Sequence, residues 1–209
     1  IAFQLAVAGV SAGSLYALIA IAIVLPFKAS GVLHFGQGEV VMLGAYVALA
    51  LTMMGLPYPV VLLGVVVAGA AVGLLIERVF IRPIVRAPEF TIVIATFAVG
   101  LLIKSLISLR FGEAPASIEG PLGTEPIILS TLRINPNALW VLVATSLVTV
   151  AIIGFFRHSR LGQAMRAVSI NVEAARLMGI KVVTAYRLSW ALSAAIAALA
   201  GLLVAPLVG

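Results

Sequence analysis

Apolar residues dominate this chain in six long runs separated by short polar or charged stretches. The runs cover residues 1–27, 32–54, 59–76, 91–109, 138–156 and 188–208. Each is close to the roughly 20 residues that a helix needs to cross about 30 Å of hydrocarbon. Because the runs are continuously apolar rather than alternating, they favour helices over the strands of a barrel. The pattern predicts an all-α polytopic membrane protein with about six transmembrane helices.

The composition agrees with this prediction and excludes a water-soluble globular domain. Of 209 residues, 63% are hydrophobic and only 10% are charged, and the mean hydropathy is +1.26. The chain begins at Ile1 and ends at Gly209 inside apolar sequence. We therefore expect one transmembrane domain over residues 1–209, cut from a longer protein that continues beyond its C-terminus.

The distribution of charge predicts the topology. The loop at 77–89 carries three arginines, and the loop at 157–187 carries five arginines and Lys181 against the single acid Glu173. If the N-terminus lies outside and every run crosses once, both loops and the short linker at 28–31 fall on the cytoplasmic side. That side then collects ten of the thirteen cations, as the positive-inside rule requires. We expect a multi-pass membrane protein with these loops in the cytoplasm.

The outer segment at 110–137 has a different character. Short apolar stretches at 127–129 and 132–134 are separated by Ser130 and Thr131, which predicts a small β-hairpin.

Tyr186 and Trp190 stand at the start of the last run and are typical of aromatic side chains at the membrane interface.

Small residues recur at a spacing of four along several runs. In lipid, such positions allow helix backbones to approach closely and gain dispersion contacts, so we expect them at helix interfaces. They are Gly9 and Gly13, Gly64 and Ala68, Gly69 and Gly73, and the group Ala194, Ala195, Ala197, Ala198 and Gly201.

A short polar helix is predicted inside the arginine-rich loop at 157–187. Asn171 is a good N-cap, Glu173 places a negative charge in the first turn, and Gly179 supplies a stop. Arg176 lies three residues after Glu173, at the spacing of a helical ion pair.

The other face of this predicted helix is apolar and contains Ala174, Leu177 and Met178. A helix of about two turns is marginal in water, so it needs a surface to lie on. Lipid headgroups and a groove on a soluble partner both fit these residues.

A second polar feature interrupts the apolar sequence at residues 34–39. Gly36 and Gly38 flank Gln37, and Glu39 then begins a helix with its charge near the favourable N-terminal end. A broken helix at membrane depth is tolerated where it lines a cavity, which would place Gln37 and Glu39 in a translocation pathway. Alternatively, Glu39 lies at the cytoplasmic interface and only caps the helix.

These stretches resemble a known family. Glu173, Ala174, Ala175 and Gly179 match the EAA-x-x-x-G signature of ABC importer permeases. The stretches GVLHFGQGE (31–39), MLGAY (42–46) and GSLYAL (13–18) are similar to segments of branched-chain amino acid ABC permeases, including related urea and amide permeases. His34 and Gly36 stand where that pattern has Asn and Ala.

The resemblance implies a permease of a bacterial or archaeal cytoplasmic membrane that translocates branched-chain or related small amino acids. In this family the loop at 157–187 is a coupling loop, so Glu173, Ala174, Ala175, Arg176, Leu177 and Gly179 would dock on an ATPase. The implied partners are a second related permease, in a hetero- or homodimer, two cytoplasmic ATP-binding subunits and an extracytoplasmic solute-binding protein. ATP and Mg would bind those subunits, and this chain would bind no cofactor.

Two other classes of protein fit the sequence less well. An intramembrane enzyme is disfavoured because the chain has no cysteine, no H-E-x-x-H and no G-x-S-x-G, and its two histidines lie far apart. A secondary transporter driven by an ion gradient would need buried ionisable groups, for which Glu39 is the candidate. That class remains the alternative.

Overall fold

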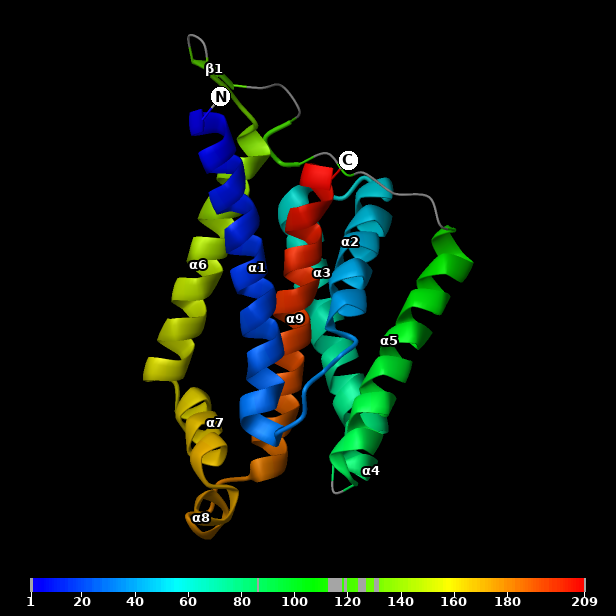
Figure 1. Ribbon diagram of the computed structural model, residues 1–209, viewed down its shortest axis with the longest axis vertical. Coiled ribbons are helices and arrows are strands. Elements are labelled where there is room, and N and C mark those ends of the chain that lie inside the picture. The colour runs from blue at the N-terminus through cyan, green and yellow to red at the C-terminus, as the bar shows by residue number, and fades with distance from the viewer. Residues whose placement is uncertain are drawn as a thin grey trace.

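The chain forms an elongated bundle of helices that run roughly along its long axis (Figure 1). This computed structural model describes residues 2–85, 87–112, 118, 120–123, 127–129 and 132–208. Its elements are α1 (Ala2–Ser30), α2 (Gln37–Met53), α3 (Tyr58–Ile76), the π-helical η1 (Glu77–Ile81), α4 (Arg82–Ile84), α5 (Glu89–Phe111), β1 (Ile127–Leu129), β2 (Leu132–Ile134), α6 (Pro136–His158), α7 (Arg160–Ile170), α8 (Val172–Leu177) and α9 (Val182–Val208).

The helices confirm an all-α polytopic membrane protein. Among the described residues, five helices are long and apolar enough to cross a membrane: α1, α3 with its extension, α5, α6 and α9. The sixth apolar helix, α2, has only 17 residues. At 1.5 Å per residue it is about 25 Å long, somewhat shorter than the hydrocarbon layer.

Helix α9 forms the centre of the bundle and packs against α1, α2 and α3. Its apolar stretch is 83% buried, far more than that of the other spanning helices. Small residues make these contacts close, because an added methyl group at Gly73 would overlap the carbonyl oxygen of Trp190, and one at Gly201 would overlap that of Val41. By contrast, a Cβ added at Gly9 or Gly13 would meet no atom of another described part of the chain within 4 Å.

The loop predicted at 77–89 is shorter than expected, because the helix continues through η1 and α4 as far as Ile84 and α5 begins at Glu89. Glu77 explains the continuation. Its carboxylate is buried, and Arg82 donates to both carboxylate oxygens at 3.0 Å. The Nε of Arg187, at the start of α9, lies 3.9 Å from the same group. Because these arginines compensate the buried carboxylate, the charged residues are compatible with a helix that continues.

The connection between the first two helices also differs from the prediction. Helix α1 continues through the expected linker to Ser30, and Gly31 ends it with a φ of +72°. Helix α2 begins only at Gln37, so the non-helical segment is 31–36 rather than 28–31. In Figure 1 this segment rises from the lower end of α1 to the start of α2 well inside the bundle. We call it the re-entrant segment.

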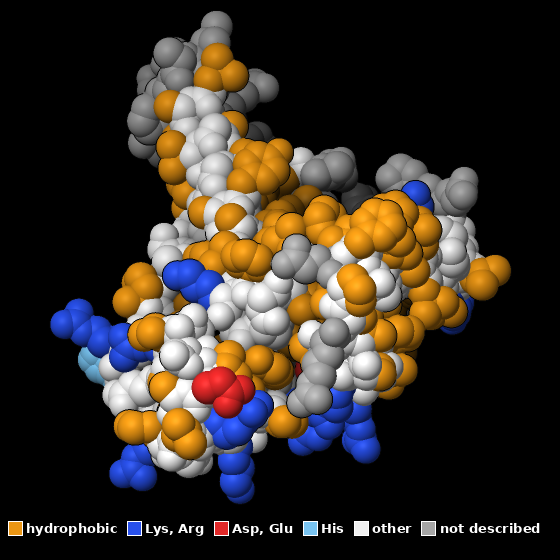
Figure 2. Space-filling view, turned by 60° about the horizontal axis from the view of Figure 1, so that its bottom comes forward, with side chains coloured by type: hydrophobic (Ala, Val, Ile, Leu, Met, Phe, Trp, Pro, Cys, Tyr) orange, Lys and Arg blue, Asp and Glu red, His pale blue; other side chains and the backbone are white. Residues whose placement is uncertain are grey.

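The predicted cations gather at one end of the bundle, which we call the basic end. It holds the end of α1, the elbow of η1 and α4, and helices α7 and α8 (Figure 1). Figure 2 shows lysine and arginine side chains around this end. Of the ten cations expected there, Arg86 lies outside the described residues.

The predicted β-hairpin lies at the opposite end and is confirmed. Strands β1 and β2 pair antiparallel, with Ile127 opposite Ile134 and Leu129 opposite Leu132. The glutamates of the outer segment, Glu113, Glu119 and Glu125, lie outside the described residues.

Candidate functional site

Two helices rather than one occupy the loop predicted at 157–187. The unpredicted α7 begins where the Ser159 hydroxyl accepts a hydrogen bond from the Gly162 amide at 2.9 Å. The predicted helix α8 begins at Asn171, whose Oδ1 accepts from the Ala174 amide at 2.9 Å. Both caps satisfy amides that a helix start leaves without partners.

The C-terminal end of α8 is as well defined as its start. The Ile180 amide donates to the Ala175 carbonyl and the Gly179 amide donates to the Arg176 carbonyl, both at 3.0 Å. This pair of bonds is a Schellman motif, which requires the left-handed φ of +80° found at Gly179. The predicted stop is therefore confirmed, and α8 is a single capped unit.

Ala175 fixes α8 to the rest of the chain. It is 4% exposed and packs in a small apolar cluster with Met165 and Val168 of α7 and Val182 and Ala185 of α9. The surface that so short a helix needs is thus supplied in part by the chain itself. A displacement of α8 would act directly on the base of α9, the central helix.

The outer side of this unit is apolar and uncovered in this chain. Leu177 is 89% exposed, Met178 is 81% exposed, and Ile170 at the end of α7 is 85% exposed. We call these three side chains the apolar tip. Helix α8 lies at the extreme of the basic end, beyond the ends of the long helices (Figure 1).

Glu173 and Arg176 form the predicted ion pair beside the apolar tip, with 3.1 Å between Arg176 Nη1 and Glu173 Oε1. Both side chains are more than half exposed. Exposed pairs of this kind add little stability, so the pair contributes little to holding α8 together.

Gln37 lies at the start of α2 and connects three elements. Its Oε1 lies 2.8 Å from the Nδ1 of His34, and its Nε2 donates to the Ser193 hydroxyl of α9 at 3.2 Å. Ser193 in turn donates to the carbonyl of Ala22 in α1 at 2.6 Å. Because Ala22 precedes the end of α1 by about two turns, this polar network lies inside the bundle.

Glu39 lies in the first turn of α2, as predicted, and is half-buried. Its carboxylate faces Gly100 of α5, where a Cβ would lie 3.1 Å from Oε2. A Cβ on Gly100 would also lie 2.9 Å from the Cα of Gly36. The glycine on α5 thus leaves room for both the re-entrant segment and the carboxylate. Within the described residues, Glu39 forms no ion pair.

The sequence did not predict the contact between His34 and Trp190. Trp190, expected at the membrane interface, is only 2% exposed, and its ring packs edge-on against that of His34 at 5.2 Å. The ring nitrogens His34 Nε2 and Trp190 Nε1 are buried without a hydrogen-bond partner in the described part of the chain. The signal for this buried polar region in the sequence was Ser193, a hydroxyl residue among alanines.

Comparison with known proteins identifies the family. Residues 5–209 match the family described as branched-chain amino acid transport system, permease component. The chain belongs to this family.

Individual relatives are similar over nearly the whole chain. The high-affinity branched-chain amino acid transport system permease protein LivH of Salmonella typhimurium is 30% identical over 216 residues, which cover 96% of this chain and 70% of the relative. LivH of Escherichia coli is 31% identical over the same length. BraD of Pseudomonas aeruginosa, a permease protein of the same description, is 29% identical over 213 residues. No solved structure matches the chain.

The candidate site of this permease has two parts. One is the α7–α8 unit with its apolar tip at the basic end, and the other is the re-entrant segment with the first turn of α2. Both contact α9, through Ala175 and Gln37 respectively. The central helix is therefore in contact with both parts.

Proposed function

We propose that this chain is the membrane-spanning permease subunit of an ATP-binding cassette importer for branched-chain or related small amino acids. The α7–α8 unit is its contact with a cytoplasmic ATPase subunit. A second permease, a pair of ATPase subunits and an extracytoplasmic solute-binding protein complete the importer, and the ATPases bind ATP and Mg. The permease family and its relatives support the substrate class.

The observation that carries the coupling role is the exposed apolar tip on a capped, anchored helix. Leu177 and Met178 are largely exposed, and the helix that carries them lies beyond the ends of the long helices (Figure 1). An apolar surface beyond the bundle end is best covered by a groove on a soluble protein. Of the two surfaces that the sequence left open, this geometry favours the protein partner.

The proposed mechanism follows from rigid connections. ATP-driven closure of the ATPase pair displaces α8, and Ala175 passes this displacement to the base of α9 and to α7. Helix α9 packs against α1, α2 and α3 and contacts the re-entrant segment through Gln37. The pathway beside Glu39 then opens toward the opposite side of the membrane. The permease thus has two conformations, and the ATPase pair shifts the balance between them from a distance.

Glu173→Lys tests this contact because it reverses the charge at the start of α8. We expect weaker co-purification of the ATPase subunits and ATP hydrolysis no longer coupled to uptake in proteoliposomes. Leu177→Ser should act similarly by making the apolar tip polar. Leu161→Ser is the matched control, since Leu161 is 49% exposed at the other end of α7.

Undiminished ATPase binding and transport in both α8 variants would contradict the proposal. The secondary-transport alternative is tested in the same vesicles. Uptake that needs ATP and binding protein and survives collapse of the proton gradient excludes an ion-driven transporter, whereas uptake lost with the gradient supports one.

A further inference from the structure

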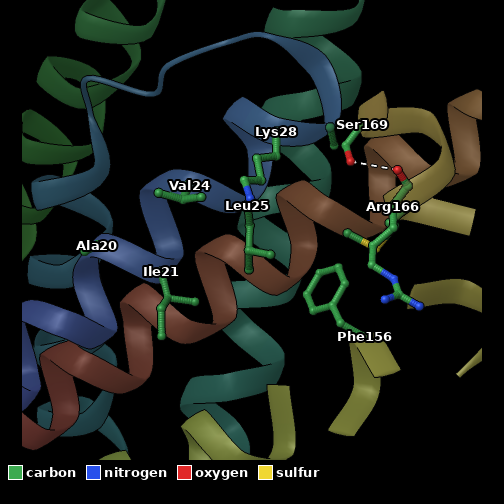
Figure 3. A pocket seen from close by; sticks show the side chains of 10 residues that line it. Ala20, Ile21, Val24, Leu25, Lys28, Phe156, Arg166 and Ser169 are labelled. Atoms are coloured by element: carbon green, nitrogen blue, oxygen red, sulfur yellow. Dashed lines mark hydrogen bonds between the residues drawn. The ribbon is translucent and has the colours of Figure 1, made fainter. Parts of the chain in front are cut away.

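A second feature of the basic end lies on the side of the bundle rather than at its tip. Helices α1, α6 and α7 enclose a pocket of about 420 Å³ beside the last turns of α1. Figure 3 shows Ile21 and Leu25 along α1 with Phe156 across from them, and Lys28 and Ser169 toward the other end of the pocket. The pocket therefore has an apolar part and a polar part.

Its polar part is cationic and has no counter-charge from the described part of the chain. Lys28 and Arg166 both line the pocket and are exposed, and no acidic side chain joins them among the described lining residues. Neither cation forms an ion pair within the described part of the chain. The Ser169 hydroxyl already donates to the Arg166 carbonyl at 2.8 Å, so the cations are the groups left to bind a ligand.

The apolar part runs from the cations toward the membrane interior. Ile21 precedes Lys28 by seven residues, which places it about 10 Å deeper along α1. Val24 on the same stretch is 43% exposed, so the pocket is open to the surroundings of the bundle. An acyl chain beside α1 and a negative headgroup between the cations match these two parts.

We propose that this pocket binds an anionic phospholipid. Its phosphate lies between Lys28 and Arg166, and one acyl chain follows Ile21 and Val24 against Phe156. Basic pockets between membrane helices bind anionic headgroups in this way. A neighbouring protein helix would have to bring an acid into an apolar setting to neutralise the same cations, whereas an anionic lipid carries its charge at the required depth.

The location gives the bound lipid a structural consequence. It bridges α1, which ends at the re-entrant segment, and α7, which carries α8. We therefore expect an anionic lipid to hold α7 against the bundle and to stabilise the anchored position of α8.

Photo-crosslinking tests the site in the full-length chain purified with its accompanying subunits. The probe is phosphatidylglycerol with a photoactivatable acyl chain, in nanodiscs of phosphatidylethanolamine and phosphatidylglycerol. We expect adducts on the peptide that contains Ile21 and Val24. Lys28→Gln and Arg166→Gln should each lower adduct yield about fivefold, and the double variant about 25-fold. The matched control is Arg160→Gln, which removes an exposed cation of α7 that does not line the pocket.

A second variant tests the apolar part without a change of charge. Ala20→Trp fills the pocket from the α1 side and should also abolish labelling. Equal yields in the double variant and in Arg160→Gln would overturn the proposal, as would equal labelling by a photoactivatable phosphatidylcholine. A cysteine at Ala20 that crosslinks to a neighbouring protein helix would show that protein, not lipid, covers the pocket.

Discussion

Gln37 and Glu39 stand two residues apart, but their side chains differ in the partners that they bind. Both ends of the Gln37 amide are bound, one near His34 and the other to Ser193, so it holds the start of α2 in place. The Glu39 carboxylate lies beside Gly100 and forms no ion pair within the described residues. Of the two predicted pathway residues, Glu39 is therefore the better candidate for transient contact with the amino group of a substrate.

Replacing Glu39 with Gln tests this role because it removes the charge and keeps the shape. If the carboxylate binds a passing ammonium group, uptake should fall about tenfold or more, since a hydrogen bond to a charged group contributes about 1.5–3 kcal/mol. The measurement is ATP-dependent uptake in proteoliposomes at matched protein content.

Subunit assembly and thermal stability of the Gln variant are the controls, because a glutamate in the first helical turn also stabilises the helix. Uptake equal to that of the native chain, with assembly intact, would leave Glu39 with the capping role alone.

At the scale of single residues, the sequence was informative wherever a side chain acts on its own neighbourhood. Asn171 was identified as a cap and Glu39 as a first-turn charge from local spacing, and both lie as predicted. Trp190 was wrongly placed at the interface because its partner, His34, comes from a segment far away in the chain. Local pattern carries no information about such partners.

Helix α8 shows how an element of six residues is kept in a single conformation. Its N-terminus is capped by Asn171, its C-terminus is closed by Gly179, and Ala175 fastens one side to the chain. No long apolar face is needed, because the ends supply the hydrogen bonds that a short helix lacks. The end at Gly179 is the most sensitive of these, since its φ of +80° disfavours any residue with a Cβ.

Gly179→Ala should therefore loosen the end of α8. The added Cβ meets no atom within 4 Å, so the cost is conformational, about 1–2 kcal/mol. We expect the amides of Gly179's neighbours Met178 and Ile180 to exchange with deuterium about 5–30 times faster, measured by mass spectrometry.

Gly179→Asn serves as the matched variant, because asparagine tolerates the left-handed conformation. Its exchange should lie close to that of the native chain. Exchange in the alanine variant no faster than in the native chain would show that the Schellman motif does not limit opening of this helix.

At the scale of elements, two differences between prediction and structure each have a physical reason. The arginine-rich stretch at 77–89 predicts a loop because charges usually end a spanning helix, yet Glu77 and Arg82 pair and the helix continues as far as Ile84. Helix α7 was missed because it is polar on one side and begins directly after α6. The β-hairpin at 127–134 was predicted correctly, since its turn and its apolar stretches are adjacent in sequence.

At the scale of the whole molecule, charge and packing are arranged along one axis. The cations predicted to face the cytoplasm gather at the basic end, and the hairpin lies at the other. The central helix α9 runs between these ends and contacts both parts of the candidate site. The orientation of this axis decides whether α8 faces the compartment that contains ATP.

Cysteine labelling measures that orientation, and because these 209 residues contain no cysteine, each variant adds a single thiol to them. A membrane-impermeant maleimide added to intact cells should label Leu122→Cys, which is 53% exposed near the hairpin end, and should leave Gln163→Cys on α7 unlabelled. Inverted vesicles should give the reverse pattern. Leu106→Cys, exposed on the side of α5, should stay unlabelled in both, since a thiol in hydrocarbon does not ionise. Labelling of Gln163→Cys from outside would place α8 away from ATP, and the coupling role proposed for it would then fail whatever the family.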